Sequence, residues 1–98
     1  MSATKRKKVP LEQVLKSLAD PVRLSIVRQL LDSANEKTCG AFECEVTKAT
    51  MSHHLAMLEA AGIIHGRQEG TRRLMSLCVE QIDRDYPGLL RLLRADVS

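Results

Sequence analysis

Aromatic side chains are almost absent from this chain of 98 residues, which has one phenylalanine (Phe42), one tyrosine (Tyr86) and no tryptophan. Proteins that read single-stranded nucleic acid stack several bases on aromatic rings. The composition therefore argues against a single-stranded target. Any nucleic acid that the chain binds should be a duplex.

Long apolar runs are also missing. The longest, at 14–18 and 26–31, are interrupted by charged or polar residues and fall well short of the ~20 residues that a membrane span needs. The basic N-terminus is followed by an amphipathic helix pattern rather than by the apolar core of a secretion signal. The sequence therefore predicts a cytoplasmic protein.

The positive charge is concentrated at one end of the chain. The formal net charge is +3, from 15 basic and 12 acidic residues. Four basic residues stand at 5–8, and without them 11 basic and 12 acidic residues remain. We expect residues 1–9 to form a basic flexible tail and residues 10–98 to form one domain. A domain of this size buries only roughly two thirds of its unfolded surface, so a second subunit would help to stabilise it.

Two helices are predicted before residue 33. Apolar residues recur with helical spacing at Leu11, Val14, Leu15 and Leu18, which indicates a short helix with one apolar stripe. Asp20 can cap the next helix, about 21–32, and proline is favourable at the first helical position that follows. Arg23 falls within the apolar face of that second helix. We expect it to be structural, with a buried carboxylate or carbonyl partner.

Residues 33–46 show little periodicity, and the pattern supports at most one short helix at 41–45. Thr47 then offers a hydroxyl N-cap to a helix over 48–61, which Gly62 ends. Met51, Leu55 and Leu58 form the core face of this helix, with Ala61 and His54 at its edge. The opposite face is made of small or polar residues suited to close approach to a major groove: Lys48, Ala49, Ser52, His53 and Ala56.

A β-hairpin is predicted after this helix, with strands at 63–68 and 71–77 around a turn at Glu69–Gly70. A recognition helix followed by two short strands is the order of a winged helix. Arg67, Arg72 and Arg73 flank the turn and are candidates for phosphate contacts. Two helical segments follow, about 79–86 and 87–94, the second rich in leucine. The predicted fold is thus mainly α with a small β-hairpin, a winged helix-turn-helix.

Three segments together resemble the ArsR/SmtB family of bacterial transcriptional repressors: LADPVRL at 18–24, TKATMSHHL at 47–55 with LEAAGI at 58–63, and GTR at 70–72. The resemblance covers about residues 10–94. It implies a homodimer joined through the first and last helices, a recognition helix at 48–61, and repression that a small inducer relieves. The positions that match the family's DNA-facing residues are Lys48, Ala49, Thr50, Ser52 and His53.

The residues allow three interpretations of the inducer. Metal sensors of the family carry a Cys-x-Cys pair before the recognition helix or an Asp/His set on the last helix, and this sequence has neither. A trivalent arsenic-like ion needs three thiolates, so a metalloid site would need Cys39, Cys44 and Cys78 together. The other interpretation is oxidation of Cys39 and Cys44, just upstream of the recognition helix. A third is that the three thiols have no sensing role, since free cysteine is usually a small buried apolar residue.

Two further classes of function are weaker. An enzyme would need a nucleophile with an oriented base, and Cys44 with His53 or His54 is the one visible pair, with no oxyanion or phosphate loop beside it. A protein-interaction module would dock partners on the leucine-rich last helix and leave the wing arginines without a role. We therefore expect a sequence-specific repressor of double-stranded DNA that needs no cofactor and recognises a roughly palindromic operator.

Overall fold

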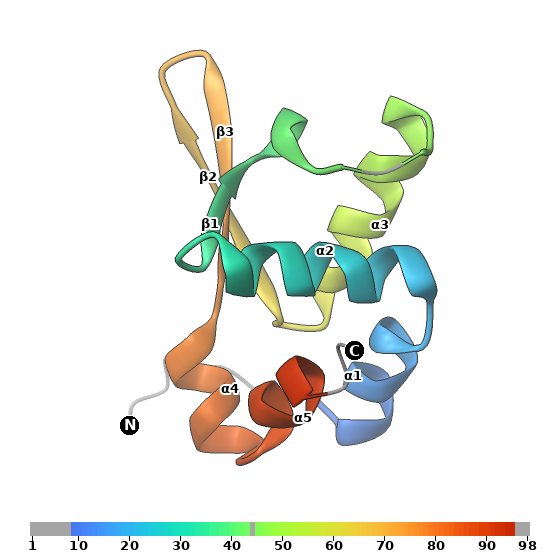
Figure 1. Cartoon of the computed structure of the whole chain (residues 1–98), viewed down its shortest axis with the longest axis vertical. Helices are drawn as coiled ribbons and strands as arrows, with labels where there is room; N and C mark the ends of the chain where they lie inside the picture. The colour runs from blue at the N-terminus through green and yellow to red at the C-terminus, as the bar shows by residue number, and fades with distance from the viewer. Residues whose placement is uncertain (1–8, 44, 96–98) are drawn as a thin grey trace.

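The computed structural model describes residues 9–43 and 45–95, so the predicted basic tail, except Val9, lies outside the described residues. The described residues form helices arranged around a small sheet (Figure 1). In chain order the elements are α1 (Leu11–Leu18), α2 (Pro21–Asp32), β1 (Glu36–Thr38), the 3-10 helix η1 (Cys39–Ala41), α3 (Lys48–Ala60), β2 (Ile64–Glu69), β3 (Arg72–Leu77), α4 (Val79–Asp85) and α5 (Leu89–Ala95).

The start of α2 follows the predicted capping chemistry. The Asp20 carboxylate accepts hydrogen bonds from the backbone N–H groups of Val22 at 2.8 Å and Arg23 at 3.2 Å. These bonds, the one from Arg23 first, lower the pKa of Asp20 because they stabilise the charged carboxylate. Pro21 occupies the first helical position, where its missing N–H costs nothing.

Helix α2 is the centre of the core. Ile26, Val27 and Leu30 are completely buried on it, and it contacts α1, α3, α5 and the sheet. Figure 1 shows α2 crossing the middle of the molecule, with α3 and the hairpin on one side and α1, α4 and α5 on the other. The core thus fixes α3 and the hairpin at one end and the first and last helices at the opposite end.

The sheet has three strands rather than the predicted two. All neighbours are antiparallel, in the order β1-β3-β2, with Glu36 opposite Ser76 and Arg67 opposite Leu74. The expectation of one short helix at 41–45 was wrong: a strand at 36–38 and a 3-10 helix at 39–41 precede Phe42. The physical reason is the turn after α2, where Ala34 and Asn35 both have positive φ, 56° and 70°, and direct the chain back along β3.

The end of α3 is set by Gly62. This residue has a φ of +76°, a conformation that glycine adopts without steric cost. The Ile63 N–H returns to the carbonyl of Leu58 at 3.0 Å, and that of Gly62 to the carbonyl of Glu59 at 3.0 Å. These bonds satisfy the last carbonyls of the helix and turn the chain into β2, which confirms the predicted boundary to within one residue.

The C-terminal helices complete the end of the molecule opposite the hairpin tip. Leu90 and Leu93 of α5 belong to the same apolar cluster as Val14 and Leu18 of α1. Three large apolar side chains remain exposed on α1 and α5, at fractions of 50%, 50% and 63%: Leu11, Leu15 and Leu92. Within the described parts of the chain, no helix has the length and apolar character needed to cross a membrane.

Candidate nucleic-acid interface

The two faces of α3 differ as the sequence predicts. Leu55 and Leu58 are buried, and Met51 is half-buried against the core. The residues predicted to face DNA are all exposed, and they are Lys48, Ala49, Thr50, Ser52 and His53. The Thr47 hydroxyl caps the helix by accepting the N–H of Thr50 at 3.1 Å. The N-terminal half of α3 is therefore a capped, exposed surface of mostly short side chains with one lysine.

Arg23 lies beneath α3 and joins three helices. It is 9% exposed, and its Nε donates to the carbonyl of Ser17 in α1 at 2.6 Å. Its Nη1 lies 3.0 Å from Nδ1 of His54 in α3. The predicted structural role of Arg23, with a carbonyl partner, is confirmed. The second partner was not predicted: His54, which the helical pattern had put at the edge of the core, is 8% exposed.

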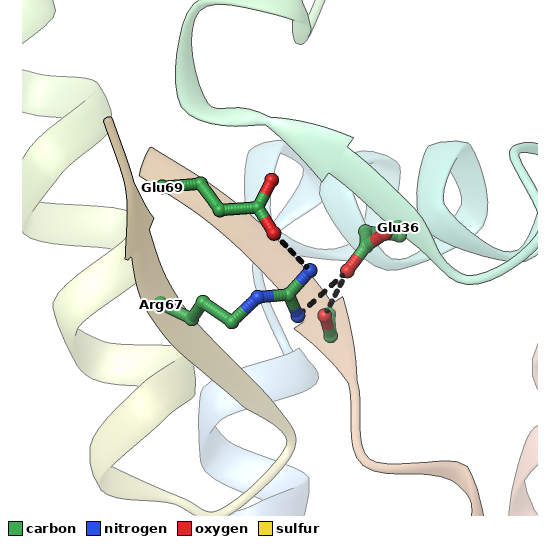
Figure 2. A network of polar contacts seen from close by, with 4 residues as sticks. Glu36, Arg67 and Glu69 are labelled. Carbon is green, nitrogen blue, oxygen red and sulfur yellow. Dashed lines mark hydrogen bonds and ion pairs between the residues drawn. The ribbon is translucent and has the colours of Figure 1, made fainter. Parts of the chain in front are cut away.

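The outer face of the sheet carries an ionic network around Arg67 (Figure 2). Arg67 Nη1 lies 3.0 Å from Oε2 of Glu36 in β1, and Nη2 lies 3.1 Å from Oε2 of Glu69. The hydroxyl of Ser76 in β3 donates to the same Glu36 oxygen at 2.9 Å. The hydrogen bond to Glu69 and the charge of Glu36 raise the pKa of Arg67. The network spans all three strands.

The inner face of the hairpin is joined to α3 by Glu59. One carboxylate oxygen of Glu59 accepts the N–H of Gly66 at 3.2 Å, and the other lies 3.7 Å from Nη2 of Arg73. The Arg73 guanidinium passes over Gly66, where an added Cβ would stand 2.4 Å from Nη2. A side chain at position 66 would therefore displace Arg73. Of the three predicted wing arginines, Arg67 and Arg73 both engage carboxylates of the protein.

A hollow of about 500 Å³ separates the N-terminal half of α3 from the wing. Basic groups from both elements line it, namely Lys48, Arg72 and Arg73, together with the hydroxyls of Ser52 and Thr71. Thr38, Cys39 and Gly40 close it on the side of β1 and η1. The fold thus gathers residues that are about 20 positions apart in sequence at one basic groove.

Two of the three cysteines lie within the described residues, and they follow different strands. The thiols of Cys39 and Cys78 are half-buried, and Cys44 lies outside the described residues. Cys39 follows β1, next to Arg73 in register, whereas Cys78 follows β3. Five positions along β3 correspond to roughly 16 Å. The three-thiolate metalloid site therefore gains no support from the fold. Among residues 9–43 and 45–95, no three His, Cys, Asp or Glu side chains are grouped to hold a metal ion.

Comparisons with known proteins agree with this geometry. A family model described as a helix-turn-helix domain matches residues 18–67. The HTH-type transcriptional regulator YceK of Bacillus subtilis is 34% identical over 83 residues, which are 83% of this chain and 83% of the relative. A second HTH-type regulator, MJ1325 of Methanocaldococcus jannaschii, is 37% identical over 60% of this chain and 67% of its own.

Solved structures show the same fold. Reduced HlyU from Vibrio cholerae superposes with a TM-score of 0.62 at 29% identity, covering 78% of this chain and 87% of its own. The winged helix-turn-helix domain of Mb0332 from Mycobacterium bovis, described as homodimeric and as possibly ArsR-family, has a TM-score of 0.68 at 24% identity, covering 100% and 94%. The two relatives, YceK and MJ1325, are transcriptional regulators rather than enzymes, and Mb0332 is described as a possible one. The chain belongs to the helix-turn-helix transcriptional regulators, and it shares its fold with winged helix-turn-helix domains described as ArsR-family.

Proposed function

We propose that the chain is a repressor that binds a specific sequence of double-stranded DNA as a homodimer. The observation that carries this proposal is the basic groove, where the exposed face of α3 meets the wing. In this arrangement α3 enters the major groove, and its short side chains let the backbone approach the base edges. The wing then lies against the flanking strand. A protein that binds genomic DNA must be in the same compartment as that DNA, so we also propose the cytoplasmic location that the sequence predicts.

The residues of this surface divide into two roles. Ser52 and His53, in the middle of the exposed face, read base edges, while Ala49 leaves room for the groove wall. Lys48, Thr50 and Arg72 hold phosphates, and the free N–H groups at the start of α3 add to this. Arg67 and Arg73 already have carboxylate partners in the free protein. Arg72 is therefore the wing arginine that we assign to a phosphate.

The homodimer is supported by the exposed leucines of α1 and α5 and by the homodimeric state of the Mycobacterium bovis neighbour. A two-fold axis through this end of the molecule presents two copies of α3 on one side. The operator is then roughly palindromic, with half-sites about one helical turn apart or somewhat more. Occupancy of such a site within a promoter prevents transcription.

Alanine substitutions separate the two roles on the DNA surface. Ser52→Ala or His53→Ala should weaken binding to the selected operator by roughly 1 to 3 kcal/mol and reduce discrimination against other sequences, because the variant side chains no longer reach the base edges. Arg72→Ala should weaken binding to all duplexes alike and lower the slope of log affinity against log salt by about 0.9 for each phosphate that is no longer bound. Fluorescence anisotropy on operator and scrambled duplexes over a salt series measures both. Equal loss of discrimination in both kinds of variant would contradict this division.

We also propose that thiol oxidation is the signal that releases the DNA. Cys39 begins η1 and lines the groove beside Lys48 and Ser52. Glu43, one residue before Cys44, is fixed to α2 by two bonds to the Gln29 amide, at 2.8 and 3.0 Å. Joining the thiols of Cys39 and Cys44 by a disulfide, with hydrogen peroxide reduced to water, constrains the chain on both sides of this anchor. This constraint would weaken the two hydrogen bonds between Glu43 and Gln29 and so displace the segment that leads into α3.

Oxidation should therefore weaken operator binding by about five- to 150-fold, the range of typical coupling between two sites. A thiol reductant should restore it, and a Cys39→Ser, Cys44→Ser double variant should bind equally well under both conditions. Cys78→Ser is the matched control and should respond like the wild type. Binding assays with peroxide, combined with mass spectrometry of the thiols, make this measurement. Release of DNA by the oxidised double variant would place the sensing elsewhere.

A further inference from the structure

The outer face of the wing brings together groups of opposite charge from two separate parts of the chain. Strand register places four polar residues on the same face of the sheet: Arg67, Glu69, Ser76 and Glu36. Glu36 pairs with Ser76, and Arg67 pairs with Leu74. Since alternate residues of a strand share a face, Leu74 and Ser76 bring their partners to the same side. Arg67 reaches from β2 across the middle strand to Glu36 in β1, as Figure 2 shows. Its second guanidinium nitrogen holds Glu69 on its own strand.

The charge balance of this group matters for a surface that approaches phosphates. It holds two carboxylates and one guanidinium, and Glu69 stands directly before the turn at Gly70. If Arg67 left to bind a phosphate, both carboxylates would lose the guanidinium that now pairs with them. Glu36 would keep the hydroxyl of Ser76 as a donor, and Arg72 stands opposite Glu69 in the strand register. All three side chains are about half-exposed, at 45%, 40% and 55% for Arg67, Glu36 and Glu69, so their charges act on the same solvent that surrounds the phosphates.

The network also fixes where the wing stands. β1 continues directly into η1, which forms one wall of the basic groove. The bond from Arg67 to Glu36 therefore ties β2 to that wall from the outer face. On the inner face, Glu59 of α3 holds Gly66 and Arg73. The hairpin is thus attached to the body of the protein on both sides, and the width of the groove depends on both attachments.

We propose that Arg67 is a positioning residue for operator binding, acting through Glu36 and Glu69 rather than through a phosphate. It neutralises the two carboxylates and holds the wing at the correct distance from α3. This inference rests on the proposed DNA-binding function and refines it. Removal of Arg67 weakens binding because the two carboxylates then repel the DNA. The effect therefore disappears when those carboxylates are also removed.

Substitutions at Arg67, Glu36 and Glu69 test this directly. The operator is the duplex that the wild-type protein selects from a random pool. Arg67→Ala should weaken binding to it by about tenfold, since a dimer has two wings and each exposed charge contributes about threefold. In a Glu36→Gln, Glu69→Gln background the same change should alter affinity by less than about twofold. In that background, where no carboxylate is left to repel the DNA, the salt slope should be nearly the same with and without Arg67. Arg67→Lys, which keeps the charge, should bind within about threefold of wild type.

The alternatives give different results. If Arg67 contacts a phosphate, its removal should weaken binding equally in the Glu36→Gln, Glu69→Gln background and lower the salt slope by about 0.9 for each phosphate released; that overturns the inference. No change for Arg67→Ala in the wild-type background also overturns it. Arg72→Ala is the matched control, because it should lower the slope in both backgrounds. A wild-type chain without salt-dependent duplex binding, or an Arg72→Ala variant with unchanged affinity, would instead contradict the proposed function. Circular dichroism melting of each variant monitors folding.

Discussion

Glutamate at both Leu15 and Leu92 is expected to convert the proposed dimer to monomers and to remove most operator binding. The two leucines are 50% and 63% exposed in the single chain. A two-fold interface contains both leucines from each subunit, so four leucine side chains are covered. Covering the exposed part of four leucines contributes about 1 kcal/mol each, and burying carboxylates instead adds a further cost. The total loss of about 4 kcal/mol corresponds to a dimer dissociation constant that is roughly 1000 times larger.

The control for this experiment is Gln13→Glu on the same helix. Gln13 is exposed and lies about 180° around α1 from the stripe of Leu11 and Leu15. The Gln13→Glu change introduces one carboxylate on α1, as Leu15→Glu does, without entering the proposed interface. Sedimentation at micromolar concentration should show a dimer for the wild type and for Gln13→Glu, and a monomer for the double variant. A double variant that still sediments as a dimer would place the interface elsewhere.

Helix boundaries were predictable where one side chain determines them. Asp20, Thr47 and Gly62 each provide a local signal, a cap hydroxyl or carboxylate or a left-handed turn, and each has that role in the structure. Strand β1 had no such signal. Its three residues are too few to show alternation, and the turn before it uses Ala34 and Asn35 rather than glycine. Its position depends on pairing with β3, about 40 residues further along the chain.

The same distinction applies to the candidate site. The exposed face of α3 follows from helical periodicity within one segment, so the sequence predicts it correctly. The three wing arginines look alike in sequence because each flanks the same turn. What separates them is cross-strand register, which puts Arg67 near Glu36 and leaves Arg73 facing Glu59 of α3. Glu69 is two positions from Arg67, but the partners on other elements, Glu36 and Glu59, are 31 and 14 positions away from Arg67 and Arg73, so no local pattern identifies these two.

The buried contact between Arg23 and His54 should have the largest effect on folding. Arginine can only donate hydrogen bonds, so Nδ1 of His54 accepts and the proton of the neutral ring is on Nε2. Removing the arginine leaves that nitrogen and the carbonyl of Ser17 without their buried donor, and removing the histidine leaves a buried guanidinium short of an acceptor. Each loss of a partner in a buried, charged contact costs about 3 kcal/mol.

Arg23→Ala and His54→Ala should therefore each lower the free energy of unfolding by about 3 kcal/mol, a large fraction of the 5 to 15 kcal/mol typical of a domain. The double variant should be less destabilised than the sum, since both changes disrupt one contact. His53→Ala is the matched control: it makes the same substitution one position away, on the exposed face, and should change stability by less than about 0.5 kcal/mol. Urea unfolding at one fixed protein concentration gives these values. His53→Ala should then weaken operator binding in a fully folded protein, whereas His54→Ala should weaken it only as far as the fold is lost. Additive losses in the double variant would mean that the two side chains stabilise the protein independently.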